Sequence, residues 1–334
     1  MKKLISTIVS LVVILAIGAA AYEAYLKKPA ANALTEPIVI GNGMTTAQIA
    51  DILKKSGVIS SNAVFTAVAD LTGKFKDFHA GTFMFKEGMS AFDALKTLSV
   101  QAQPEISITI PEGYGLREIG DRLAKEKIIG ASADLFKVTG EPAKIGGFDA
   151  ALANDYPFLA YKPVKNGLEG YLFPDTYRFY AATPAATVVR RMLDGYAAKV
   201  GTLAQPPDYA TLIIASLIER EVKDPADRAK VADIIKRRLA LGMPLQFDST
   251  VNYATGKSSP SVSSNDLAVD SLWNTYKHTG LPPTPICSPG LDSIKAALAP
   301  TANKYLYFLT TADGTVIYSK TLEEHNAAKA KYLK

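Results

Sequence analysis

Cysteine and histidine are scarce in this chain of 334 residues: Cys287 is its single thiol, and its histidines are His79, His278 and His325. One thiol cannot form a disulfide within the chain, and these four residues are too few and too scattered for a closed zinc site. We therefore expect no structural metal and no cofactor. Because no histidine lies near Cys287 in sequence, we expect a buried thiol and not a nucleophile.

The chain also lacks a block of like charge. It has 37 Lys and Arg against 32 Asp and Glu, a net charge of +5, and the basic residues are scattered among acidic ones. No basic stripe is visible, so nucleic acid is not an expected partner. With 48% hydrophobic and 21% charged residues, the composition is that of a globular protein with material for one large domain or two smaller ones.

One long apolar run is present at the N-terminus. Lys2 and Lys3 precede residues 4–22, which are interrupted only by small or hydroxyl side chains. A helix of that length can cross the hydrocarbon core of a bilayer, and lysines before it favour a cytoplasmic tip of residues 1–3. We predict a single-pass anchor in the plasma (inner) membrane, a linker over 23–37 that is rich in Ala and Pro, and a periplasmic body.

A cleaved signal peptide is the alternative interpretation of this run. Small residues at 19–21 and 30–33 both offer cleavage sites. The run is longer than the usual apolar region of a signal peptide, which favours the anchor. The body of the protein is exported under either interpretation.

Two stretches seventy residues apart, 38–55 and 108–125, resemble each other. Each predicts a short strand, a glycine turn and an amphipathic helix. The coinciding positions are Ile38/Ile108, Ile40/Ile110, Gly43/Gly113, Ile49/Ile119, Asp51/Asp121, Leu53/Leu123 and Lys55/Lys125. A third, fainter copy covers 83–98, and Ser61 suits the N-cap of a further helix over 61–71.

Residues 38–85 thus predict the order strand, helix, helix, strand, which is the order of a LysM-like carbohydrate-binding module. Packing alone also produces such units in many α+β folds, so glycan binding by this module stays open. A second region, 169–180, is dense in aromatic residues around a Pro174-Asp175 turn. It suits either a sugar site, because sugar rings have apolar faces, or a strand in the core.

A helix over 209–222 carries the candidate acid. Its first half is strongly apolar and is followed by Glu219-Arg220-Glu221. Glutamates two positions apart on a helix point in very different directions, so at most one should enter a given pocket. Ile214, Leu217 and Ile218 surround the stem of Glu221, and burial raises the pKa of a carboxyl as a general acid requires.

Glu219 instead precedes Lys223 by four residues, which predicts an exposed ion pair, although Glu219 is kept as a candidate substrate contact. Asp224 and Pro225 are an N-cap and a first-turn proline for the next helix. Glu221 therefore lies beside a helix break, where a side chain can face a cleft.

These residues resemble the endolytic murein transglycosylases, also called the YceG-like family, over a stretch that runs from the apolar N-terminal segment to His325-Asn326. The matching segments are 80–83, 169–177, 215–221 with its Glu-Arg-Glu motif, 237–251, 274–276, 280–283, 288–290 and 305–308. The chain departs from the pattern near 314–318, where many members have a histidine, and at Cys287-Ser288. Only a histidine role in that loop is put in doubt.

The resemblance implies a lytic transglycosylase that cuts the MurNAc–GlcNAc bond inside nascent peptidoglycan strands and leaves 1,6-anhydro ends. The second glutamate of the motif, Glu221, is then the catalytic residue. One carboxyl group can serve as acid and then as base, so no second carboxylate is required. Peptidoglycan synthases are partners that the family suggests.

We predict an α+β fold with a LysM-like module over 38–105 and a catalytic domain over 106–334. Polar groups between apolar runs and turns tend to line a site, which makes Gln246, Asp248, Asn274 and Tyr276 candidates for substrate hydrogen bonds. Core or turn roles remain open for these four. The rival function is a non-catalytic wall-binding scaffold that holds synthesis enzymes at the membrane.

Overall fold

The computed structural model describes residues 17–19, 21–22, 35, 37–41, 43–100, 104–259 and 262–332, and the fold is a mixed α+β fold with small two-stranded sheets. The chain forms two compact units, one of residues 1–106 with 179–184 and one of 107–178 with 185–334. No helix in the described part of the chain is both long and apolar enough to span a bilayer. The predicted span, 4–22, lies outside the described residues except at 17–19 and 21–22.

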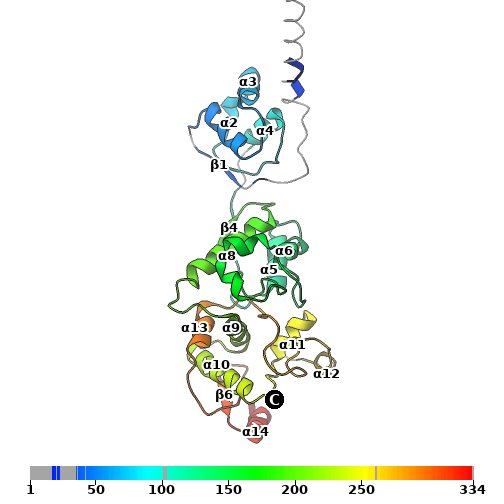
Figure 1. Ribbon diagram of the computed structural model, residues 1–334, viewed down its shortest axis with the longest axis vertical. Coiled ribbons are helices and arrows are strands. Elements are labelled where there is room, and N and C mark those ends of the chain that lie inside the picture. Colours follow the sequence, from blue (N-terminus) through cyan, green and yellow to red (C-terminus); the bar gives the residue numbers. More distant parts are fainter. Residues whose placement is uncertain are drawn as a thin grey trace, which may run out of the picture. The chain divides into compact units, whose positions relative to one another are not determined.

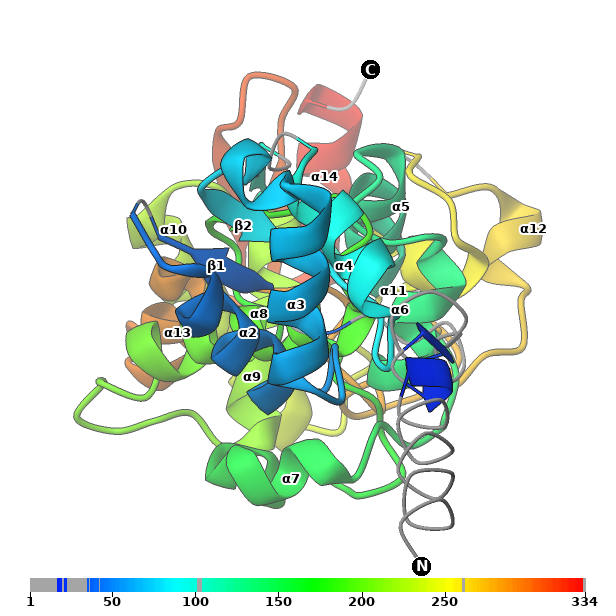
Figure 2. The same cartoon turned by 90° about the horizontal axis from the view of Figure 1, so that it is seen from above.

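The first unit has the predicted order strand, helix, helix, strand (Figures 1 and 2). Strands β1 and β2 pair antiparallel with Ile38 opposite Phe83, and helices α2, α3 and α4 pack together. The elements are β1 (Ile38–Ile40), α2 (Thr46–Lys55), α3 (Asn62–Thr72), the 3-10 helix η2 (Lys74–Asp77), β2 (Gly81–Phe83) and α4 (Ala91–Leu98). The likeness to a LysM module, and glycan binding by it, stay predictions.

Side-chain caps fix where these helices start. Ser61 accepts a hydrogen bond from the amide of Val64 at 3.3 Å, which confirms it as the N-cap of α3. Thr45 and Gln48 form a reciprocal capping box at the start of α2. The amphipathic faces then close over one core that includes Ile49, Leu53 and a fully buried Phe65.

The repeat seen in the sequence is a repeat in structure. The second unit opens with β3 (Ile106–Thr109) and α5 (Leu116–Lys125), which correspond to β1 and α2 of the first unit. Gly43 and Gly113 both have positive φ, +76° and +81°, a conformation that glycine adopts without a steric cost. The coinciding apolar residues are buried in both copies, as Ile49 and Ile119 illustrate.

The second unit is mainly helical. Its elements after α5 are α6 (Ser132–Thr139), α7 (Ala151–Asp155), the 3-10 helix η3 (Pro157–Tyr161), β4 (Thr176–Phe179), α8 (Ala185–Lys199), α9 (Tyr209–Glu221), α10 (Pro225–Ala240), α11 (Asp248–Thr255), α12 (Ser264–Leu267), α13 (Leu291–Leu298), β5 (Tyr307–Thr310), β6 (Val316–Ser319) and α14 (Leu322–Tyr332). Helices α9, α10 and α13 pack on one another, and α14 packs on the β5–β6 hairpin (Figure 1).

The aromatic stretch at 169–180 belongs to the core of this unit. Tyr171 is buried, and its ring centroid lies 5.3 Å from that of Tyr196 and 6.1 Å from that of Phe158. The hydroxyl of Tyr177 donates a hydrogen bond to the carbonyl of Phe173. Of the two interpretations of this stretch, packing in the core is the one that the structure supports.

Candidate active site

Helix α9 positions the candidate acid, because every residue from Leu212 to Ile218 is buried and the helix cannot rotate without exposing that surface. Asp208 caps its N-terminus through the amide of Thr211 at 2.7 Å. The helix ends at Glu221, and α10 begins four residues later at Pro225 with Asp224 as its N-cap. Glu221 is therefore the last helical residue before a break, as the sequence predicts.

Glu221 faces a cleft of about 620 Å³. Side chains from several parts of the second unit line it: the end of α9, helix α10, helix α11 with the segments on either side of it, the loop that carries Tyr276, strand β5 and helix α14. The lining residues are Arg220, Glu221, Arg238, Gln246, Phe247, Asp248, Ser249, Asn252, Ser259, Tyr276, Tyr307, Phe308, Leu309, Thr310, Leu322, His325 and Lys329. The lining combines aromatic and hydrogen-bonding side chains, which suits a carbohydrate.

The carboxyl group of Glu221 is enclosed by protein, and one edge of the residue remains open to the cleft. Burial raises the pKa of Glu221 from 4.5 to about 7, and the nearby charge of Asp248 acts in the same direction. The hydroxyl of Ser249 donates a hydrogen bond to Oε1 of Glu221 at 2.6 Å, which partly offsets the rise, as does Arg220. Glu221 is thus poised to give up and regain a proton near neutral pH.

Three of the predicted polar residues lie together in this cleft. The hydroxyl of Tyr276 donates to Oδ1 of Asp248 at 2.6 Å, and Gln246 accepts a long contact of 3.4 Å from Arg238. Gln246 has a positive φ of +55°, and its backbone amide donates a hydrogen bond to the carbonyl of Thr275. The structure therefore brings Gln246, Asp248 and Tyr276 into one cleft with Glu221.

Asn274 lies elsewhere. Its side chain is fully buried, and its amide donates to the carbonyls of Leu267 and Val269 at 3.0 and 2.9 Å. It is absent from the cleft lining. The structure gives it the turn role that the sequence left open, since it closes the loop between α12 and Tyr276.

The predicted ion pair between Glu219 and Lys223 is wrong. Glu219 instead pairs with Arg228 at 3.0 Å, and the two side chains are only 6% and 9% exposed. Its second oxygen accepts the amide of Gly290 at 2.9 Å, which ties α9 to the start of α13. Helix α10 packs beside α9 after the break, which brings Arg228 to Glu219. The spacing of four residues between Glu219 and Lys223 could not reveal this tertiary contact. Glu219 is not part of the cleft lining.

Several cleft residues escaped the sequence analysis. Ser249 is the most consequential, because its hydroxyl donates a hydrogen bond to Glu221, yet no periodicity marks it. Its position in the matching segment 237–251, beside the candidate Asp248, is the hint that the sequence offers. Arg238 belongs to α10, and the sequence pointed to it only as part of the matching segment 237–251. His325 lies on α14 and stacks on Tyr307 with ring centroids 5.3 Å apart, so a histidine does reach the cleft, although from outside the 314–318 loop.

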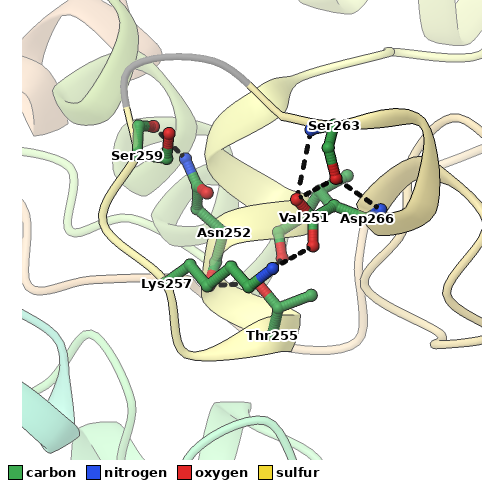
Figure 3. Close-up of polar contacts among 7 residues, drawn as sticks. All are labelled: Val251, Asn252, Thr255, Lys257, Ser259, Ser263 and Asp266. Carbon is green, nitrogen blue, oxygen red and sulfur yellow. Dashed lines mark hydrogen bonds and ion pairs between the residues drawn. The ribbon is translucent and has the colours of Figure 1, made fainter.

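Polar contacts hold the wall of the cleft that follows α11 (Figure 3). Asn252 donates its side-chain amide to the carbonyl of Ser259 at 2.7 Å, and both residues line the cleft. The ammonium of Lys257 pairs with Asp266 at 2.5 Å (Figure 3). The hydroxyl of Ser263 caps α12 by accepting from the backbone amide of Asp266, and it donates to the carboxylate of the same residue. These contacts fix the ends of the segment between α11 and α12.

A second buried carboxyl group, that of Glu169, contacts helix α11. It accepts hydrogen bonds from the hydroxyl of Tyr253 at 2.9 Å and from the amide of Leu116 at 3.0 Å. Burial raises the pKa of Glu169 to about 8. Glu169 is absent from the cleft lining. Its hydrogen bonds connect α11 to the start of α5. Cys287 is also fully buried, as expected, and its thiol donates to the carbonyl of Ser216.

The fold and the cleft match known proteins. The family model described as YceG-like family matches residues 38–331. A protein of Bacillus subtilis (strain 168) named "Endolytic murein transglycosylase" is 36% identical over 312 residues, which cover 90% of this chain and 85% of that protein. A protein of the same name from Streptococcus pneumoniae serotype 2 (strain D39) is 32% identical, and the match spans 88% of this chain and 58% of that longer protein.

A solved structure is similar as well. The crystal structure of a putative yceG-like protein from Listeria monocytogenes superposes with a TM-score of 0.57 at 32% identity, covering 88% of this chain and all of that one. The α+β fold is therefore shared with proteins of one class. The chain belongs to the YceG-like family, as the resemblance of its motifs predicted.

Proposed function

We propose that this chain is an endolytic lytic transglycosylase that cuts the MurNAc–GlcNAc bond within peptidoglycan strands, with Glu221 as its catalytic residue. The observation that carries the proposal is the environment of the Glu221 carboxyl group. It is buried, accepts a hydrogen bond from Ser249 and belongs to a residue that lines a cleft of about 620 Å³, and its pKa is about 7. The names of the B. subtilis and S. pneumoniae relatives support the reaction class and the murein substrate.

The chemistry needs a single carboxyl group in two protonation states. Protonated Glu221 gives its proton to the glycosidic oxygen, and the bond between that oxygen and C1 of MurNAc breaks. The C6 hydroxyl of the same MurNAc then bonds to C1 and returns its proton to the Glu221 carboxylate. No water is consumed, and the product ends in a 1,6-anhydro ring. A pKa of about 7 keeps both states accessible at neutral pH.

The surrounding groups suit this cycle. Ser249 holds the carboxyl group in one orientation and stabilises its ionised state, while the charge of Asp248 opposes early loss of the proton. Tyr276 fixes Asp248 in place through its hydroxyl. Gln246, Asp248 and Tyr276 are then the side chains that we propose for hydrogen bonds to the sugar.

We also propose that the enzyme acts outside the cytoplasm from a membrane anchor at 4–22. The support is the pair Lys2 and Lys3 before an apolar run long enough to cross a bilayer. Purified membranes should yield a mature protein that still contains residue 1. An N-terminus after residue 21 or 33 would instead indicate a cleaved signal peptide, and export would stand.

The test of the reaction is product analysis on purified glycan strands. Wild-type protein should release fragments with 1,6-anhydro-MurNAc ends, and Glu221→Gln should release none while keeping its fold by circular dichroism. Fragments with reducing MurNAc ends would show hydrolysis and refute the lytic mechanism. Binding of strands without any cleavage would favour the rival function, a wall-binding scaffold.

A further inference from the structure

Arg238 is a buried cation whose protein partners carry no negative charge. The residue is 6% exposed and lines the cleft. One guanidinium nitrogen donates to the carbonyl of Leu245 at 2.9 Å, and another makes the 3.4 Å contact with Gln246. Its charged carbon lies 5.2 Å from the ring centre of Tyr307, and its Nε atom is buried with no hydrogen-bond partner in the described part of the chain.

A buried arginine of this kind is unusual, because guanidinium groups stay protonated and buried charges are ordinarily paired. Within the described residues no carboxylate lies within 4.0 Å of Arg238. The contrast with Arg228 is instructive, since that guanidinium is equally buried and has Glu219 as its counterion. Carbonyl, amide and ring contacts reduce the cost of burying Arg238 but leave its charge unbalanced.

Two further basic side chains share this end of the cleft. Lys329 and His325 of α14 both line it, and His325 stacks on the same Tyr307 ring that Arg238 faces. Burial lowers the pKa of His325, and the charges of Lys329 and Arg238 act in the same direction. Asp248 and Glu221 also line the cleft, so acidic and basic side chains share it.

We infer that Arg238, with Lys329 beside it, forms a carboxylate-binding subsite that recognises the 3-O-lactyl arm of a muramoyl residue. The inference rests on the proposed function, since it assigns a part of the same cleft to a part of the same polymer. A guanidinium binds a carboxylate through charge-assisted hydrogen bonds, and the terminal nitrogen whose contact is the long one to Gln246 has a donor left for such a bond.

Two carboxylates on this arm have the same chemistry. In a strand stripped of peptides the lactyl carboxylate is free, whereas in a strand that keeps its stems the lactyl group is an amide and the carboxylates belong to the attached peptide. A neutral sugar without the lactyl arm offers neither. The subsite thus predicts selection of muramoyl glycans over neutral ones of equal length.

The test measures binding without turnover, in Glu221→Gln protein, by isothermal titration calorimetry. The probes are a peptide-free muramoyl tetrasaccharide with free lactyl carboxylates, the same compound with its carboxylates converted to methylamides, and a peptide-bearing tetrasaccharide. We expect the best carboxylate probe to bind at least about tenfold more tightly than the methylamide. The tighter of the two carboxylate probes identifies which carboxylate is read.

Added substitutions then locate the subsite. Arg238→Gln should abolish the preference for the carboxylate probes. Lys329→Gln should reduce this preference, and because Lys329 is exposed, this variant keeps the test decisive if Arg238→Gln folds poorly. Lys331→Gln is the matched control, because it lies on the same helix outside the cleft lining and should change nothing. Equal affinity for all three probes, or an unchanged preference in Lys329→Gln and a folded Arg238→Gln, overturns the inference. Wild-type cleavage of strands reports separately on the proposed function.

Discussion

Replacing Glu221, the proposed catalytic acid, should make the protein more stable at alkaline pH. Glu221 has a folded-state pKa of about 7 against an ordinary value of 4.5, because its carboxyl group is enclosed by protein. The folded state therefore holds this proton more tightly than the unfolded state does. Below the unfolded pKa both states are protonated and no difference arises. Between 4.5 and about 7 the unfolded state gains stability by ionising, and above 7 the penalty on the folded state is constant.

The magnitude follows from the shift. A rise from 4.5 to about 7, at about 1.4 kcal/mol per pKa unit, destabilises the folded protein by up to about 3 kcal/mol at pH 8. Glu221→Gln removes the ionisation and keeps an oxygen that can accept the Ser249 hydrogen bond. The variant should therefore melt roughly 6–12 °C above wild type at pH 8. Near pH 4.5 the two proteins should melt together.

Thermal unfolding followed by circular dichroism from pH 4.5 to 8.5 measures this difference directly. Other buried acids, including Glu169, titrate alike in both proteins and cancel in the comparison. A Glu221→Gln variant that is no more stable than wild type at pH 8 would refute the enclosed, high-pKa carboxyl group. A gain of the same size at every pH would point to packing instead of ionisation.

Three further outcomes follow from the site and its supports. Ser249→Ala should raise the pKa of Glu221 above 7, because the hydroxyl favours the ionised form, and should shift the pH–rate profile of strand cleavage to higher pH; an unchanged profile contradicts this role. Glu219→Gln should lower the free energy of unfolding by about 3–5 kcal/mol, because it leaves Arg228 buried without its ion-pair partner. The folded fraction should still cleave strands at near the wild-type rate. A loss under about 1 kcal/mol would indicate that the ion pair is exposed to solvent. Cys287 should resist thiol reagents in the folded protein and react only in denaturant, because it is fully buried; rapid labelling without denaturant would contradict that burial.

Local patterns in the sequence were sufficient to predict several of the helices. Ser61 and Asp224 cap helices where predicted, because a hydroxyl or carboxylate beside free amides stabilises a helix start locally. The repeated strand, glycine and helix units were predictable for the same reason, since Gly43 and Gly113 meet a backbone requirement within each unit. Apolar spacing also predicted that Glu221 would lie at the enclosed end of α9.

The sequence by itself thus determined the family, the candidate acid and the helices that carry it, because these depend on neighbours within a few residues or on motifs in order. Only the tertiary structure decided which charges meet. Arg228 reaches Glu219 from the next helix, Ser249 reaches Glu221 across 28 positions, and Arg238 is buried in the cleft without any acid beside it. Such contacts depend on how α9, α10 and α11 pack, and helical spacing carries no information about partners on other elements.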